Sequence, residues 1–243
     1  MLKAAIEKIQ EMAQPIIKEI DGKTFCISKE SISEIKPMID LPQRLTVNSL
    51  DSLIQMVKTE GIILEKPPLY VQVPNHEKVV CFCQYDKEIR CIRKNLYDAI
   101  ATDIPGWSEK VTMKFEEAMI AIRTRFQESQ DSLYALKLLS DITTGSKITY
   151  NDNGIVTSVV TKTGIAMQSN ESIRPIIKLR PYRTFQEVEQ PESLFLIRIN
   201  EHGITFVEAD GGMWKLTARN TVKSYLEKAL SDEISEGTVV VSL

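Results

Sequence analysis

The sequence predicts an α+β protein in which antiparallel β-hairpins and a sheet pack against amphipathic helices. In the first and middle parts of the chain, apolar residues recur at helical spacing between hairpin-like runs. From Lys147 onward, the apolar residues fall in short runs rich in β-branched types and separated by turn residues. The C-terminal half is therefore expected to be rich in strands and to carry one final helix.

Length and composition favour an ordinary globular protein. The chain has 243 residues, of which 43% are hydrophobic and 26% charged, so it can bury a substantial core. Its net charge of −3 and its pI of about 5.6 argue against a protein that holds duplex nucleic acid by a global positive field. The N-terminal residues lack the apolar core of a signal peptide, and no apolar run approaches the roughly 20 residues that span a bilayer. We expect a cytoplasmic protein without a membrane partner.

The first part of the chain combines helical and strand signals. Asp21-Gly22 suits a type I′ turn, because both residues tolerate a positive φ, and it predicts a hairpin of 15–20 and 23–27. Asn48 and Ser49 are expected to cap a helix that starts at Leu50, with Gly61 just past its end. The other elements expected here are a helix at 2–13, a strand at 44–47, a hairpin of 69–73 and 79–85, and a third strand at 88–92.

The later part of the chain contains the clearest hairpin. A four-residue loop between 194–199 and 204–209 places Ile199 opposite Ile204, and we expect the aligned apolar face to pack against the C-terminal helix around Val222 and Leu226. The other elements expected here are helices at 115–126 and 132–142 and strands at 148–150, 155–162, 173–179 and 238–242. We divide the chain into an N-terminal region, 1–110, and a C-terminal region, 111–243, which could also form one continuous domain.

A basic and aromatic run is the best candidate for a ligand site. Arg180 and Arg183 could bind a phosphate or carboxylate in bidentate fashion, and Tyr182 could stack on a base. The alternative is that these charges pair with the acidic residues that follow in the same stretch. Those acidic residues are Glu187, Glu189 and Glu192.

A glycine pair supplies a second candidate. Backbone amides of Gly211 and Gly212 could approach a ligand, with Asp210 as a polar group beside them. The same residues are typical of any tight connection from a strand to a helix, and no nucleotide-binding glycine motif is present. We favour the structural turn here, and we expect Trp214 to be a packing anchor.

No cofactor and no metal is expected. Cys81 and Cys83 share one face of a strand and Cys91 is near in sequence, but this spacing is a poor match to the paired ligands of a structural zinc site. The chain's two histidines, His76 and His202, both fall in predicted hairpin loops. They offer little material for a general base, so we predict no catalytic residues.

Two stretches carry a resemblance to a known family. The run from Leu179 to Pro191, LRPYRTFQEVEQP, and the run from Phe206 to Trp214, FVEADGGMW, resemble uncharacterised proteins of tailed phages and prophages, the YfdQ-like family. The resemblance covers 115–230. It implies a phage or prophage origin and the host cytoplasm as the setting, and it assigns no catalytic residue.

These observations leave three functions open. The first is a non-enzymatic phage or prophage accessory protein that works by homo-oligomeric assembly or by binding a partner protein. The second is a protein that binds an anionic small molecule, such as a nucleotide signal of a host defence system, through Arg180, Tyr182 and Arg183. The third is a protein that binds single-stranded nucleic acid during phage recombination.

Overall fold

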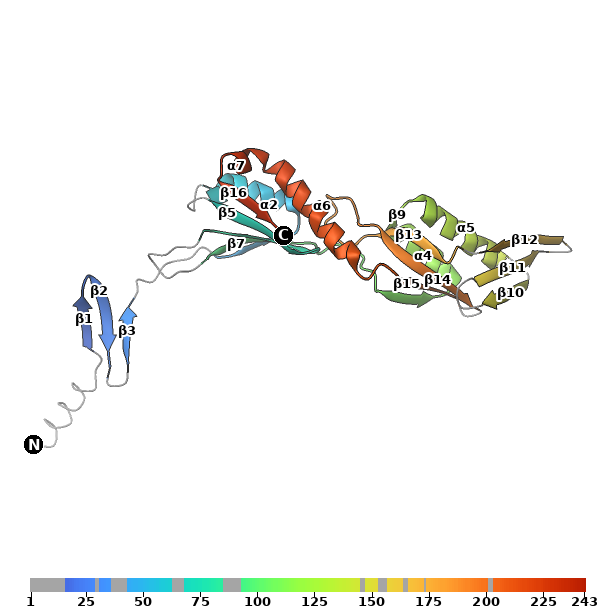
Figure 1. The fold of residues 1–243 in the computed structure, drawn as a ribbon, viewed down its shortest axis with the longest axis horizontal. Helices are drawn as coiled ribbons and strands as arrows, with labels where there is room; N and C mark the ends of the chain where they lie inside the picture. The colour runs from blue at the N-terminus through green and yellow to red at the C-terminus, as the bar shows by residue number, and fades with distance from the viewer. Residues whose placement is uncertain are drawn as a thin grey trace, which may run out of the picture. The chain divides into compact units, whose positions relative to one another are not determined.

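The computed structural model describes most of the chain, as drawn in Figure 1. The described residues are 16–28, 31–35, 43–62, 68–84, 93–144, 147–152, 157–163, 166–172, 174–200 and 203–243. The helix expected at 2–13 and the strand expected at 88–92 lie outside them, as do Cys91 and His202. The described residues form an α+β fold, as predicted, and no helix among them is long and apolar enough to cross a membrane.

The chain divides into two compact units. Unit 1 comprises 1–43 and 85–94, and unit 2 comprises 44–84 and 95–243. The boundary expected at 110/111 thus lies inside unit 2. The physical reason is that a helix and a strand from the C-terminal part complete the core formed by 45–100.

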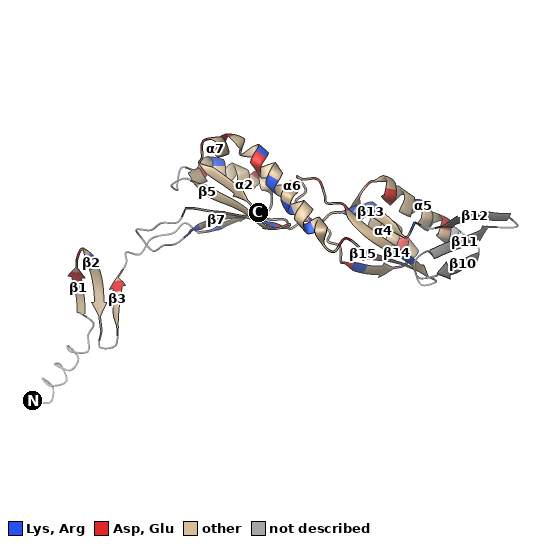
Figure 2. Ribbon diagram, in the orientation of Figure 1, with Lys and Arg blue, Asp and Glu red and all other residues tan. Residues whose placement is uncertain are grey.

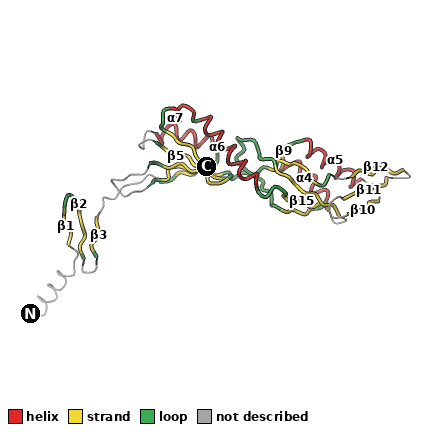
Figure 3. Tube along the Cα trace, in the orientation of Figure 1, coloured by secondary structure: helices red, strands yellow, loops and turns green. Residues whose placement is uncertain are grey.

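Unit 1 contains a three-stranded antiparallel sheet in the order β1-β2-β3. Asp21 and Gly22 have φ angles of 52° and 76°, which confirms the predicted turn between β1 (Ile16–Ile20) and β2 (Lys23–Ile27). β3 (Ile32–Ile35) pairs with β2 and completes the sheet. Figure 3 draws the described part of this unit in strand and loop colours alone.

The first sheet of unit 2 has five strands in the order β16-β5-β6-β7-β4, antiparallel in the middle and parallel at both edges. The predicted edge pairing of the last strand is confirmed, because β16 runs parallel to β5. β7 was not predicted: Asn95 and Asp98 interrupt its apolar pattern, yet Asp98 is buried. The strands are β4 (Leu45–Val47), β5 (Leu69–Asn75), β6 (Lys78–Phe82), β7 (Asn95–Ile100) and β16 (Val239–Ser242).

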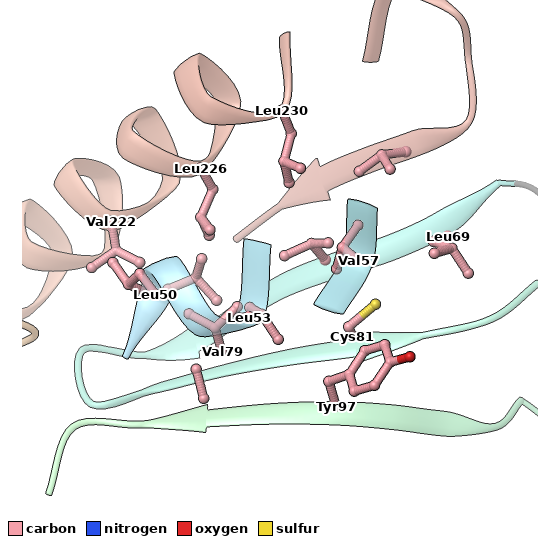
Figure 4. Packing of buried hydrophobic residues seen from close by; sticks show 14 of the residues in the cluster. Leu50, Leu53, Val57, Leu69, Val79, Cys81, Tyr97, Val222, Leu226 and Leu230 are labelled. Atoms are coloured by element: carbon pink, nitrogen blue, oxygen red, sulfur yellow. The ribbon is translucent and has the colours of Figure 1, made fainter. Parts of the chain in front are cut away.

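Helices cover one face of this sheet. α2 (Leu50–Met56) begins at Ser49, whose Oγ accepts a hydrogen bond from the Ser52 amide as expected of an N-cap. Figure 4 shows Val222 and Leu226 of α6 (Met213–Ala229) pointing toward the residues of α2 and β6. The short helix α7 (Ser231–Ser235) follows α6.

The predicted role of Gly61 was wrong. The helix does not stop before it: a π-helical turn, η1, continues α2 from Val57 to Gly61. A Cβ atom at Gly61 would lie 2.9 Å from Leu69 Cδ1 and 3.4 Å from Tyr97 Cε2, so any larger residue there would force these side chains to shift.

The second sheet of unit 2 has the order β8-β15-β14-β13-β9. The predicted hairpin is confirmed, with Ile199 opposite Ile204 and Ile197 opposite Phe206. Its expected packing partner was wrong, since its apolar face packs against α4 (Phe115–Arg125) and α5 (Gln130–Thr144), not against the C-terminal helix. The strands are β8 (Lys110–Met113), β9 (Phe126–Gln127), β13 (Ile176–Pro181), β14 (Ser193–Asn200) and β15 (Gly203–Glu208).

A third sheet in unit 2 has the order β10-β11-β12. Its strands are β10 (Lys147–Asp152), β11 (Thr157–Thr163) and β12 (Ala166–Ser172). The first two correspond to predicted strands, whereas β12, with its polar sequence, was not predicted. Residues 153–156, between β10 and β11 in the chain, lie outside the described residues.

Candidate functional site

The best-defined polar cluster in unit 2 surrounds Arg183, which is only 3% exposed. Its Nη2 donates to Glu208 Oε1 at the end of β15, and its Nη1 lies 3.2 Å from Ser193 Oγ. Glu208 Oε2 accepts a 3.0 Å hydrogen bond from Trp214 Nε1, and the guanidinium carbon lies 4.3 Å from the centre of the Trp214 ring. We call these four residues the arginine cluster.

Electrostatics in the cluster favour a fixed ion pair. Burial lowers the pKa of the Arg183 guanidinium, and the neighbouring Glu208 carboxylate opposes that shift. An arginine keeps its charge under such conditions, because its ordinary pKa is far above neutrality. The pair therefore holds its charges in a place closed to solvent, where a partner for each charge is required.

His76, in the turn between β5 and β6, packs edge-on against Trp214 with ring centres 4.7 Å apart. Burial is the main cause that lowers the pKa of His76, and the positive charges of Lys215 and Arg183 act in the same direction. The carboxylate of Glu77 raises that pKa but does not compensate. Burial therefore favours the neutral form of the His76 side chain.

In residues 182–192, which we call the link segment, the side chain of Gln190 makes several hydrogen bonds to the backbone. Gln190 Oε1 accepts hydrogen bonds from the amides of Arg183 and Thr184, at 2.9 and 3.2 Å, and its Nε2 donates to the Phe185 carbonyl. Thr184 Oγ1 donates to the His76 carbonyl. The segment therefore connects the strands of the second sheet to the β5–β6 turn of the first.

Arg180 has different partners from Arg183. Its guanidinium contacts Glu189 and lies 3.5 Å from Glu192, and Lys178 Nζ is 3.2 Å from the same Glu192. Arg180 therefore pairs with the acidic residues that follow it, which was the alternative to ligand binding considered from the sequence. Arg180 and Arg183, which the sequence suggested could hold the same anion, contact different carboxylates.

The other candidate ligand residues make hydrogen bonds within the fold. The amide of Tyr182 donates to the Arg125 carbonyl at 3.0 Å. Asp210 Oδ1 accepts from the Gly212 amide at 3.0 Å, and Gly211 and Gly212 have φ angles of 62° and 79°. These residues make the tight turn that leads from β15 into α6, which is the structural interpretation favoured by the sequence.

A pocket of about 310 Å³ lies beside the start of α2, close to the lower limit for small-ligand sites. Two amides at the start of α2 already have acceptors, since Leu50 N donates to Glu187 Oε1 at 2.7 Å and Ser52 N donates to Ser49 Oγ at 3.1 Å. Gln186 Nε2 donates to the Asp103 carbonyl across its rim. The pocket is lined by Asn48, Ser49, Ala101, Thr102, Asp103, Ile104, Phe185, Gln186 and Glu187, and so by neither Arg180 nor Arg183.

Two cysteines, Cys81 and Cys83, are core residues. Both are buried, neither forms a disulfide within the described residues, and burial raises the pKa of Cys81 to about 12. The described residues contain no group of three or more His, Cys, Asp and Glu side chains that could hold a metal ion. Charged groups instead pair with one another, as Asp98 does with Lys78 at 3.0 Å and Arg44 at 3.5 Å.

Sequence reasoning missed Glu208, Ser193 and Gln190. Glu208 ends a strand of alternating character, where an acidic residue ordinarily faces solvent. Nothing local distinguishes it, because its partner Arg183 lies 25 positions earlier. One signal could have suggested it. Arg183 and Trp214 both carry N–H groups that require an acceptor when buried, and a nearby carboxylate can accept from both.

Comparison with known proteins finds no matching family model, no matching curated protein and no matching solved structure.

Proposed function

We propose that the protein works by assembly with other protein chains, in the first place with copies of itself, and that it does not act as an enzyme. The observation that carries this proposal is the sheet of unit 1. Ile16, Ile17 and Ile32 are 64%, 67% and 70% exposed, and Ile20 and Ile35 are exposed as well. Five exposed isoleucines in fourteen strand residues are unusual for a folded surface.

The physical argument is one of stability. A three-stranded sheet keeps its structure in water when one of its faces is covered by other apolar groups. In the described part of unit 1 no helix supplies that cover. A binding partner that buries the isoleucines would stabilise the sheet and would itself be held there.

The arginine cluster supports the same proposal indirectly. Arg183 and Glu208 neutralise each other in a buried place, and Arg180 pairs with exposed glutamates. These contacts serve the fold of unit 2, so they favour assembly over binding of an anionic small molecule. The phage or prophage setting, in the host cytoplasm, rests on the resemblance of 179–191 and 206–214 alone.

Light scattering coupled to size-exclusion chromatography tests the proposal. We expect the full chain at micromolar concentration to elute as an oligomer whose mass is a multiple of 27.6 kDa. Dilution should shift the mass toward that of the single chain, because association follows mass action. A single-chain mass throughout the micromolar range would contradict the proposed function.

A further inference from the structure

The turn between β5 and β6, residues 74–77, reaches the arginine cluster through one side chain. Its other three residues are exposed, whereas the His76 side chain is only 20% exposed. The imidazole ring packs edge-on against Trp214, a buried residue in the first turn of α6. His76 therefore covers one side of the arginine cluster.

Hydrogen bonds hold this turn on two sides. The Glu77 carbonyl accepts from the Ala101 amide at 2.9 Å, and Asn75 Oδ1 accepts from the Glu77 amide at 2.9 Å, so these bonds tie the turn to the first sheet and to itself. On the other side, the His76 carbonyl accepts from Thr184 Oγ1 of the link segment. The backbone and the ring of one histidine thus connect the turn to the link segment and to α6.

The indole ring that His76 contacts already has two cations beside it. The guanidinium carbon of Arg183 lies 4.3 Å from the centre of the Trp214 ring, and Lys215 Nζ lies 5.6 Å from it. A protonated His76 would bring a third positive charge to the same ring. Like charges repel more strongly in a partly buried place than in water, because the effective dielectric constant is lower there.

Carboxylates near His76 do not compensate for these cations. Glu77 Oε1 lies 3.5 Å from His76 Nε2, but the Glu77 side chain is half exposed, so water screens its charge. Glu208, at the end of β15, and Asp210, in the turn that follows, act on Arg183. Burial is the first cause that lowers the pKa of His76, and it prevails together with the two cations over the opposing carboxylate.

We propose that the β5–β6 turn is a pH-sensitive lid, and that protonation of His76 releases it from Trp214 and opens the arginine cluster to water. In the open form His76 titrates near its ordinary pKa of 6.5, whereas in the closed form its pKa is lower. The closed form is therefore fully favoured above pH 6.5 and loses that advantage as the pH falls toward the lower pKa. Val73 and Val79 on either side of the turn are fully buried, so the release is confined to 74–77.

Hydrogen exchange at the chain's two indole N–H groups, followed by NMR in the full chain, tests this lid. The Trp214 N–H donates to Glu208, so its exchange requires the cluster to open. Trp107, whose ring packs in the second core, is the internal reference, and the ratio of the two rates cancels the common pH dependence of exchange. From about pH 7.5 to about pH 5 the Trp214/Trp107 ratio should rise, by up to about tenfold for each unit between the two pKa values of His76.

Four variants assign the rise to His76 and its neighbours. His76→Gln removes the titrating group and should abolish the rise. Lys215→Gln removes a nearby cation and should make the rise smaller, whereas Glu77→Gln removes the favourable carboxylate and should make it larger. Lys228→Gln, at an exposed position in the last turn of α6, changes the net charge equally and is the matched control that should leave the rise unaltered.

Circular dichroism over the same pH range should show unchanged secondary structure, since the lid opens without unfolding either core. A constant ratio of exchange rates, or a rise that persists in His76→Gln, overturns the lid. So does a Trp214 N–H that becomes exchangeable only at the pH where circular dichroism records unfolding. None of these readouts depends on the mass of the particle, so the lid is tested separately from the proposed assembly.

Discussion

At the scale of single residues, Arg183 shows how a side chain's environment decides its role. Two arginines three positions apart have the same chemistry, yet Arg183 is buried against Glu208 whereas Arg180 is 34% exposed beside Glu189. A buried charge deprived of its partner is costly, while an exposed pair is screened by water. The two positions should therefore differ strongly in their effect on stability.

Arg183→Leu should lower the free energy of unfolding by about 3–5 kcal/mol, because it leaves the Glu208 carboxylate buried and unpaired. Arg180→Leu is the matched control and should cost less than about 1 kcal/mol. Urea unfolding followed by circular dichroism measures both. A loss of less than about 1 kcal/mol for Arg183→Leu would show that the Arg183 pair does not stabilise the fold.

His76 should make the stability of the protein depend on pH. Burial lowers its pKa below the ordinary value of 6.5, so the unfolded chain binds a proton more readily than the folded one. The contribution of neutral His76 is complete above pH 6.5 and is lost as the pH falls through the interval between 6.5 and the lower folded pKa.

His76→Gln should therefore lose less stability than the wild type between about pH 7.5 and about pH 5. His202→Gln serves as the control, since these are the chain's two histidines. Urea midpoints at both pH values supply the comparison. A wild-type pH dependence that His76→Gln leaves unaltered would refute this assignment.

At the scale of elements, the C-terminal helix shows that an apolar stripe does not identify its partner. The predicted stripe of α6 is correct, and Val222 and Leu226 are fully buried. They belong to the core of the first sheet, whereas the neighbouring hairpin β14–β15 packs on α4 and α5. The Asp210–Gly212 turn separates the hairpin from the helix and lets each join a different core.

Leu226→Ala should cost about 2–5 kcal/mol of stability, as expected for a large apolar side chain removed from a core. Leu216→Ala, at an exposed position of the same helix, should have little effect. Amide hydrogen exchange locates the change. Leu226→Ala should raise the exchange rates of amides in β5 and β6 more than those of amides in β14 and β15. A larger increase in β14 and β15 than in β5 and β6 would indicate that α6 packs against the second sheet.

At the scale of the whole molecule, the two units differ in what stabilises them. Unit 2 has two hydrophobic clusters, one for each five-stranded sheet, and the link segment joins elements of both. Some charges in unit 2 pair locally, as Lys223 does with Glu227 at 3.5 Å, but α6 carries more basic than acidic residues, as Figure 2 shows. The described sheet of unit 1 has exposed isoleucines on both of its faces, which is why the mass of the particle is the decisive measurement for the function proposed here.

Much of the fold could be predicted from the sequence because its signals are local. Asp21-Gly22 determines a turn by its tolerance of positive φ, Ser49 caps a helix with its own hydroxyl, and the spacing around 200–203 sets the register of a hairpin. Each of these features depends on residues a few positions apart. The α+β class follows from adding them together.

The tertiary structure alone decided which surfaces meet. Glu208 as the partner of Arg183, β7 with its buried Asp98, and Gly61 beneath Leu69 all depend on contacts between distant segments. The sequence by itself determined the main helices and hairpins and the uneven distribution of apolar residues, but not strands such as β7 and β12. Packing decided which elements pair. The hydrophobic effect is non-directional and depends only on the apolar area removed from water, so an apolar face is stabilised by any apolar partner that the topology brings close.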